Sequence, residues 1–405
     1  MILAVKLGIV IAALIVLLRL KLDLAPALLL SAAVTILLFQ INIVQAARSA
    51  VGMVIAPKTL QLYIIILMVL YISEVQKSRQ MFEKLIRSLN VMIRDSRLVA
   101  MVSPAIIGFL PMLGGALFSA PLVEEAVKKM EWKPEFKTFV NYWFRHLWEF
   151  VWPVYAGLLI FQTLSHIPLK EIILFQSPFT LLNIVSGVAV CFLYFRRHRI
   201  GRRPPDAANH AWGTFRDFFG GIWPLLLVIL LYFIFSIPLY IDLPLTAVLL
   251  TFAVRFRPRE IAAAFFSRIM LRTLILLAAV MAFQGIIEIS NISATLSEME
   301  VSLGMIVFFS FLISFSMGFL TGVNVAYIAI AYPIMLPLIQ HQPNFLSLSL
   351  YVFVIGFAGI LLSPLHLCLV LTNEYFKSNL YKVYYYLIPP VLLLIIISTA
   401  LALLL

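Results

Sequence analysis

Apolar runs of roughly 20 residues recur along the whole chain, and this feature excludes most folds. A run of that length lets a helix cross the hydrocarbon core of a bilayer, which is about 30 Å thick. Hydrophobic residues make up 63% of the 405 residues and charged residues only 12%. A water-soluble domain could not bury so much apolar surface. The chain is therefore predicted to be an all-α polytopic membrane protein.

The apolar runs predict ten transmembrane helices and two re-entrant hairpins. Two stretches, 98–127 and 301–339, are interrupted by Gly, Pro and small polar residues. Because such residues interrupt or bend a helix, each stretch is predicted to enter and leave the membrane on one side. The ten predicted spans cover residues 2–18, 24–41, 60–76, 136–164, 178–195, 219–236, 239–254, 268–289, 346–371 and 385–404.

The basic residues predict an orientation for this topology. Ten crossings and two hairpins place 25 of the 30 Lys and Arg residues on one side of the membrane. That side is predicted to be cytoplasmic by the positive-inside rule, which leaves both termini extracytoplasmic in a plasma (inner) membrane. Since most of the basic residues lie in short loops, they argue against a nucleic-acid partner. Residues 77–97 carry an apolar stripe opposite a basic face, which predicts a helix at the bilayer interface.

The two halves of the chain contain weakly similar segments in the same order. LDLAPALLLSAAV from Leu22 resembles IDLPLTAVLLTFAV from Ile241, and GFLPMLGGALFSAP from Gly108 resembles GFLTGVNVAYIAIAYP from Gly318. Because each half has five predicted crossings, an odd number, the second half is predicted to be inverted in the membrane. Inverted repeats are typical of secondary transporters. The predicted divisions are a first repeat (1–195), a basic linker (196–212) and a second repeat (213–405).

Equivalent predicted spans in the two halves each contain a helix-breaking proline. Pro153 ends the sequence WEFVWP, and Pro364 ends GILLSP. A proline removes a backbone hydrogen bond and clashes with the preceding turn. The freed N–H and C=O groups are tolerated at membrane depth only where protein, water or a solute satisfies them. Both positions are therefore predicted to be helix breaks that contribute to a solute or ion site.

Three ionisable residues lie together inside the predicted span 136–164. Arg145 and Glu149 are four residues apart and share one face of a helix, and His146 lies three residues before Glu149. Charged groups inside a membrane are costly and are often functional. The functional interpretation is that Arg145 binds an anionic group while His146 or Glu149 binds a proton. The alternative is a neutralised ion pair that tethers two helices.

Further candidate binding residues lie beside the second break and at the two hairpin tips. His366 and Ser363 flank Pro364, although each could equally be a packing residue or bond to its own helix. Glycines at the tips could expose backbone amides or only allow close helix packing. The tip residues predicted to bind solute or ion are Pro111, Gly114, Gly115, Ser119, Thr321, Gly322 and Asn324.

The segment GFAGILLSPLHLCLVLTNEYF (356–376), together with GFLPMLGG and the ten predicted spans, resembles the DUF401 membrane family. That family resembles part of the ion transporter superfamily. The resemblance implies an elevator-type carrier in which a scaffold domain holds a homodimer and a transport domain carries hairpins and broken helices. It implies a site among Pro111–Ser119, Trp148–Pro153, Thr321–Asn324 and Ser363–His366. The tips differ from the Ser-Asn-Thr of sodium–dicarboxylate carriers, so the solute and coupling ion stay open.

Together these features predict a secondary active transporter that moves a small, anionic solute with a proton or sodium gradient. No metal-binding or nucleophile–base spacing is present, so neither an enzyme, a cofactor nor a metal site is predicted. Cys191 and Cys368 lie in apolar stretches and are predicted to be buried structural thiols. The alternatives are a cation–proton antiporter, a translocase for a lipid or polyprenyl carrier, and a membrane scaffold without transport activity.

Overall fold

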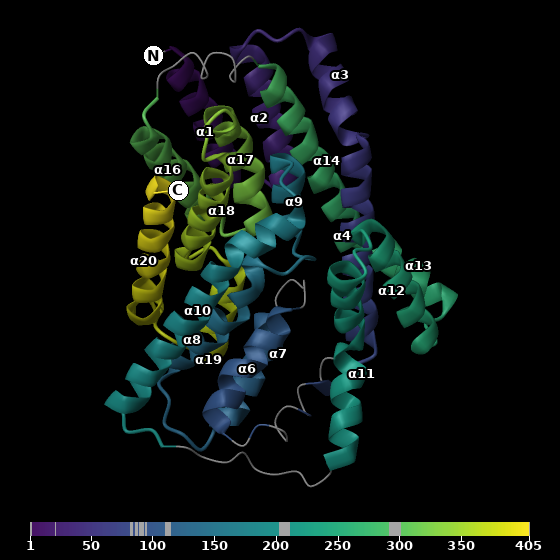
Figure 1. Cartoon of the computed structure of the whole chain (residues 1–405), viewed down its shortest axis with the longest axis vertical. Helices are drawn as coiled ribbons and strands as arrows, with labels where there is room; N and C mark the ends of the chain where they lie inside the picture. The colour runs from purple at the N-terminus through teal and green to yellow at the C-terminus, as the bar shows by residue number, and fades with distance from the viewer. Residues whose placement is uncertain are drawn as a thin grey trace.

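The computed structural model describes most of the chain and consists of helices in the described part (Figure 1). It describes residues 2–20, 22–81, 84–85, 88, 93, 95–109, 115–201, 211–290 and 301–404. Among these, seven helical segments are long and apolar enough to cross a membrane, and shorter apolar helices occupy other predicted spans. The seven are Pro57–Ser78, Leu169–Arg197, Phe215–Ile234, Pro258–Ile289, Leu303–Thr321, Phe345–Phe376 and Leu380–Leu404. The prediction of a helical membrane protein is thereby supported, and the count of ten spans stays a prediction.

One set of helices, which we call the frame group, lies on the upper and right-hand parts of Figure 1. Helix α14 packs against α2 and α3, and α12 packs against α4. Its members are α1 (Ile2–Arg19), α2 (Leu24–Leu38), α3 (Ile43–Val54), α4 (Pro57–Ser78), α11 (Ala211–Ile229), the π-helical η2 (Leu230–Ile234), α12 (Leu239–Ala253), α13 (Pro258–Phe265) and α14 (Arg268–Ile289).

The second set, the hairpin group, contains two helical hairpins and the helices packed on them. Helices α6 and α7 pack as one pair and α16 and α17 as the other. The frame and hairpin groups meet where α4 contacts α9 and α14 contacts α17. The members of the hairpin group are α6 (Ser96–Gly108), α7 (Ala116–Val127), α8 (Pro134–Arg145), the 3₁₀ turn η1 (Leu147–Phe150), α9 (Ala156–Ser165), α10 (Leu169–Arg197), α16 (Leu303–Thr321), α17 (Asn324–Ile339), α18 (Phe345–Leu362), α19 (Leu367–Phe376) and α20 (Leu380–Leu404).

Each group takes helices from both halves of the chain. The frame group combines α1–α4 with α11–α14, and the hairpin group combines α6–α10 with α16–α20. Each of the predicted divisions, 1–195 and 213–405, therefore contributes helices to both groups. Most of the predicted linker 196–212 lies outside the described residues, as does much of the predicted interfacial helix 77–97.

Both predicted helix breaks are present. Helix α8 ends at Arg145 and α9 begins at Ala156, so the chain leaves α-helical geometry around Pro153. Helix α18 ends at Leu362 and α19 begins at Leu367, with Pro364 between them. In Figure 1, α6 and α7 lie in the lower half of the molecule, whereas α16 and α17 lie in the upper half. The hairpins thus approach the middle of the hairpin group from opposite ends.

Two helices lie outside the predicted spans. Residues 43–54 form α3, where the Asn42 side chain accepts hydrogen bonds from the first backbone N–H groups. Residues 258–265 form α13, which contacts α4 through the stacked rings of Tyr71 and Phe265 and lies beside the ion pair between Arg79 and Glu260 at 3.0 Å. Helix α16 runs unbroken for 19 residues and could span a membrane by length and composition. Re-entrant placement of the second hairpin therefore stays a prediction.

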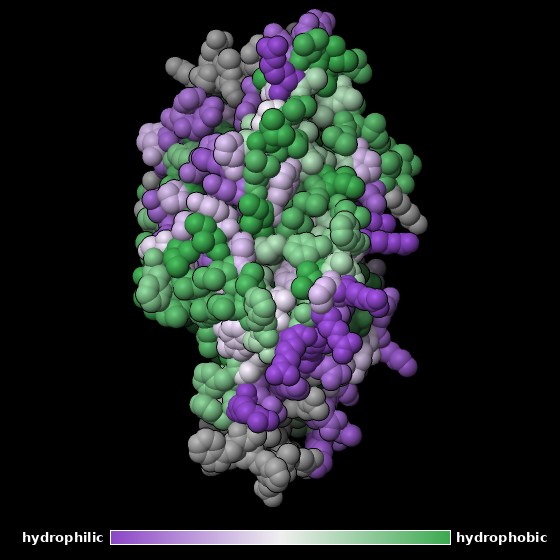
Figure 2. Space-filling view, turned by 90° about the vertical axis from the view of Figure 1, so that its right-hand side faces the viewer, coloured by the Kyte–Doolittle hydropathy of each residue, from purple (hydrophilic) through white to green (hydrophobic). Residues whose placement is uncertain are grey.

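The outer surface of the molecule is largely apolar. Figure 2 shows hydrophobic side chains over much of the middle of the molecule, while hydrophilic ones gather towards its lower end and near its top. Large apolar side chains are exposed on helices of both groups, among them Leu37, Phe192, Phe252 and Ile396. An extensive exposed apolar surface of this kind suits lipid contact.

Candidate functional site

A chain of hydrogen bonds joins the two helix breaks. His146 caps the C-terminus of α8, and its Nδ1 lies 2.7 Å from the carbonyl oxygen of Tyr142. Its Nε2 lies 3.0 Å from Nε2 of His366, which precedes α19. Nδ1 of His366 in turn lies 2.6 Å from the carbonyl oxygen of Gly322, at the tip of the second hairpin. The two breaks and one hairpin tip therefore meet at the two histidines.

Glu149 connects the first break to the second hairpin. The side-chain amide of Asn324, the first residue of α17, donates to Oε2 of Glu149 at 2.7 Å. The first turn of α9 lies directly against this amide, since a Cβ built at Gly157 would lie 2.4 Å from Oδ1 of Asn324. Glu149 is only 7% exposed. A buried carboxylate is thus held by a charge-assisted hydrogen bond from the other half of the chain.

Arg145 connects the first break to the first hairpin and to α19. The residue is buried, and its Nη1 lies 3.5 Å from Sγ of Cys368. A Cβ built at Gly115 would lie 2.3 Å from Nη2 of Arg145, and one at Gly108 would lie 2.4 Å from its carbonyl oxygen. Glycine at both positions lets the hairpin lie close to Arg145. We call Arg145, His146, Glu149, Asn324, His366 and Cys368 the polar cluster.

The second break is fixed mainly by backbone contacts. The hydroxyl of Ser363 donates to the carbonyl oxygen of Phe319 at 2.6 Å and accepts from the N–H of Leu365 at 3.2 Å. Gly322 ends α16 with φ of 62°, a left-handed conformation that favours glycine. A Cβ at Gly322 would lie 2.7 Å from the backbone nitrogen of His366. Ser363 and Gly322 therefore hold the hairpin tip against the break.

The other predicted site residues support the local backbone or lie apart from the cluster. Ser119 and Thr321 donate to carbonyl oxygens of their own helices, at 3.3 Å to Ala116 and 2.7 Å to Met317. Pro153 is buried within the first break, whereas Pro364 is exposed at the second. The predicted tip residues Pro111 and Gly114 lie outside the described residues.

The sequence interpretation missed two residues of this region. Cys368 is buried as predicted, but its thiol lies beside Arg145 instead of in an apolar environment. Its position two residues after His366, a predicted site residue, could have identified Cys368 as part of the site. The ring of Tyr142 lies 4.7 Å from that of His146 and 5.6 Å from that of His366, and its hydroxyl donates to the backbone of α18. Tyr142 is four residues before His146, and helical spacing could have identified it.

Three possible metal ligands lie close together in the cluster, but their geometry suits a hydrogen bond better. The ligand atoms of His146, His366 and Cys368 lie within 4.8 Å of one another. Two histidine nitrogens bound tetrahedrally to one zinc ion would be about 3.3 Å apart. The observed 3.0 Å is a normal hydrogen-bond length. The positive charge of Arg145 beside the thiol also opposes binding of a divalent cation.

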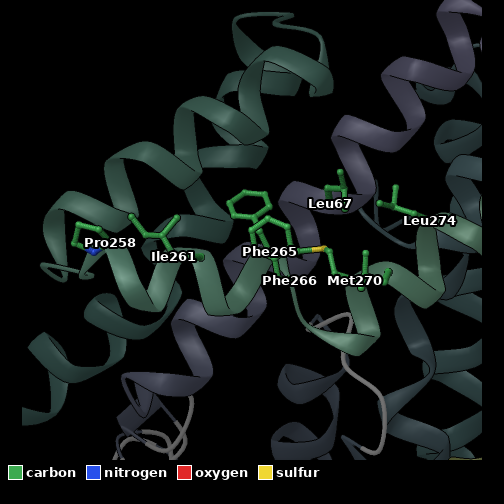
Figure 3. Close-up of a pocket in the computed structure, with 9 residues that line it drawn as sticks. Leu67, Pro258, Ile261, Phe265, Phe266, Met270 and Leu274 are labelled. Carbon is green, nitrogen blue, oxygen red and sulfur yellow. The ribbon is translucent and has the colours of Figure 1, made fainter.

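A separate cavity of about 530 Å³ lies where α13 packs beside α4 and α14 (Figure 3). Its lining residues are all apolar and include Leu67, Phe265 and Met270. It shares no residue with the polar cluster. A site that orients a charged solute requires a few convergent polar groups, so the polar cluster is the better candidate.

The polar cluster combines opposite charges, imidazoles and a thiol at the meeting point of helix breaks and hairpin ends. No curated protein sequence matches the chain. The sequence profile of one family, described as proteins of unknown function (DUF401), matches residues 4–405. Since that match covers nearly the whole chain, this protein belongs to the DUF401 family.

Proposed function

We propose that this protein is a secondary active transporter for a small anionic solute, coupled to a proton or sodium gradient. The observation that carries the proposal is the largely buried polar cluster, in which both breaks and parts of both hairpins contact one another. Charged groups at membrane depth are costly unless they serve ion or solute pathways. In this proposal Arg145 binds the anionic group of the solute, and the amide of Asn324 orients Glu149.

The packing of the helices supports an elevator-type mechanism of alternating access. The polar cluster lies wholly within the hairpin group, and the frame group contributes none of its residues. The two groups contact each other through α4 with α9 and α14 with α17, while most other helix contacts lie within one group. Movement of the hairpin group along the frame group would therefore carry the intact cluster from one face of the membrane to the other.

The proposal includes a location, an orientation and an oligomeric state. The distribution of basic residues supports insertion in a plasma (inner) membrane with both termini extracytoplasmic. In that orientation the α6–α7 hairpin re-enters from the cytoplasmic side and the α16–α17 hairpin from the opposite side. A homodimer joined through the frame groups would give the moving groups a fixed support. The molecular mass of the detergent-solubilised protein would test this dimer.

Uptake by proteoliposomes tests the transport proposal. Purified protein is first screened for thermal stabilisation by small organic and inorganic anions, with and without sodium. Anions that stabilise it are then offered to proteoliposomes under a pH gradient or a sodium gradient. The proposal requires solute accumulation that collapses when the gradient is dissipated. If none of the anions that stabilise the protein is moved under either gradient, the transport proposal fails.

A cation–proton antiporter is the second candidate, because Glu149 is a buried carboxylate of the kind that exchanges a cation for a proton. A dye that reports lumenal pH distinguishes this activity. An antiporter changes lumenal pH when sodium or potassium is added without an anionic solute, whereas the proposed anion carrier does not. A scaffold or a lipid translocase would give neither response.

A further inference from the structure

The orientation of two histidines determines how many protons they hold. Nδ1 of His146 faces the carbonyl oxygen of Tyr142 at 2.7 Å, and Nδ1 of His366 faces that of Gly322 at 2.6 Å. A carbonyl oxygen can only accept a hydrogen bond, so each Nδ1 must carry a hydrogen. Two of the four ring nitrogens are thereby protonated, which is the full complement of two neutral imidazoles.

The remaining two nitrogens face each other and need one more proton. The Nε2 atoms of His146 and His366 are 3.0 Å apart. In two neutral rings both atoms would present lone pairs, and this contact would be repulsive. A hydrogen bond at this distance requires that one Nε2 donate to the other. We propose that His146 and His366 form a proton-binding site that holds one shared excess proton with a net charge of +1.

The proton site itself does not depend on the proposed function. Its role as the site of the coupling ion does, because that role requires that the protein is a transporter. The two histidines come from the two different breaks, so the proton bridges both halves of the chain. Binding or release of the proton would make or remove a direct bond across the cluster. The class of coupling ion would then be a proton, and the proposed carrier would not depend on sodium.

The groups around the histidine pair determine the net charge of the site when it holds the shared proton. Arg145 and Glu149 belong to the first break, and their formal charges offset each other. Cys368 faces the pair from α19 and Tyr142 from α8, and the proposed charge of +1 corresponds to a site in which both side chains keep their protons. Among described residues, the second hairpin contributes the uncharged Gly322 and Asn324, and the phenol of Tyr384 on α20 donates to the carbonyl oxygen of Leu362 beside the second break.

A net charge of +1 in a largely buried site favours an anion with one negative charge. Moving an uncompensated charge through a membrane is costly, whereas the proton and a monoanion together leave the site neutral. The hairpin group would therefore carry the site across the membrane readily when the site holds the proton and the monoanion together. The solute class that fits this charge balance is a small monoanion such as a monocarboxylate, transported together with one proton.

Solid-state NMR of the protein labelled with ¹⁵N-histidine in lipid bilayers tests the proton site without any solute. At pH 8 an imidazole in water is about 97% neutral. The proposal predicts the ¹⁵N signals of one cationic imidazole per protein at that pH. A spectrum in which every histidine is neutral at pH 8 would overturn it. The unmodified protein alone decides this outcome, so the test does not depend on the folding of a variant.

Variants assign the signal to its residues. The cationic signal should disappear in His146→Gln and in His366→Gln. His198→Gln is the matched control, because Nδ1 of His198 also faces the carbonyl oxygen four residues earlier, at 3.0 Å from Tyr194. His198 lies at the end of α10, away from the cluster. Loss of the signal in His198→Gln, with retention in His146→Gln, would overturn the assignment.

Transport measurements separate the coupling role from the proposed function itself. For a monoanion identified in the proteoliposome screen, uptake should follow the pH gradient, and His366→Gln should lose that dependence. If uptake follows only sodium and the histidines are neutral, the further inference fails while the transporter remains. If no solute is moved but the cationic signal is present, the proton site stands and the transport proposal fails.

Discussion

The two helix breaks lie in different halves of the chain and differ in chemistry. The first runs from the end of α8 to the start of α9 and brings in Arg145 and Glu149. The second, between α18 and α19, contains no acid or fixed cation and contributes His366 and Ser363. The first break thus supplies the charges, and the second holds the hairpin tip through its serine and imidazole.

Glu149→Gln is expected to reduce uptake more than any other substitution, because it removes a charge from the first break. The substitution keeps the shape of the side chain but replaces the charge-assisted bond from Asn324. Hydrogen bonds to charged groups are worth about 1.5–3 kcal/mol, so uptake should fall roughly ten- to hundredfold. Uptake by proteoliposomes measures the effect. Glu171→Gln is the control, since Glu171 is exposed in the first turn of α10 and its loss should leave uptake unchanged.

Gly322→Ala should have the next largest effect, and on stability as well as uptake. Alanine is strained at φ of 62° by about 1–2 kcal/mol, and its Cβ would lie 2.7 Å from backbone at the second break. The melting temperature of the purified protein should therefore decrease. Gly304→Ala in α16 is the control, because a Cβ there has no atom within 4 Å. Equal melting temperatures for the two variants would contradict the described tip contact.

Gly115→Ala should reduce uptake with a smaller effect on stability. The added methyl group would meet the end of the Arg145 side chain, which can move, instead of backbone. The guanidinium would be displaced from its position beside Cys368 while the fold is retained. Uptake and melting temperature measured on the same preparation test this. A large loss of stability without a change in uptake would indicate that the glycine serves packing alone.

Ser363→Ala should have the smallest effect of the four substitutions. It removes one bond to Phe319 in α16 and one to Leu365, at a cost of about 1 kcal/mol each. Ser347→Ala removes only a bond to Asn344, close in sequence, and is the matched control. Thermal unfolding should show a larger decrease for Ser363→Ala. Equal decreases would mean that Ser363 does not hold the hairpin against the break.

The sequence was informative where composition and proline positions determine structure. Apolar runs predicted membrane helices, and Pro153 and Pro364 predicted the breaks, although Pro178 and Pro333 lie inside unbroken helices and proline alone does not determine a break. The location of α13 was not predicted, since it packs on α4 through contacts between residues far apart in sequence, among them the stacked rings of Tyr71 and Phe265 and the ion pair between Arg79 and Glu260. Sequence periodicity contains no information about such a pair.

The candidate site was predictable in its parts but not in its arrangement. Arg145, His146 and Glu149 stood out as ionisable groups in an apolar run, and Asn324 as a polar residue at a hairpin tip. That Asn324 reaches Glu149 and His366 reaches His146 depends on tertiary packing. Cys368 was assigned to packing because a thiol in an apolar run has no distinguishing pattern.

The most direct test of the central claim is the accessibility of the cluster from each side of the membrane. The chain has two cysteines, so Cys191→Ser leaves Cys368 as the only thiol, beside Arg145 in the cluster. A small membrane-impermeant thiol reagent is applied to right-side-out and to inside-out vesicles of this variant. Alternating access predicts that Cys368 is modified from both sides. Modification from one side only, or from neither, would contradict the claim that the cluster is carried across the membrane.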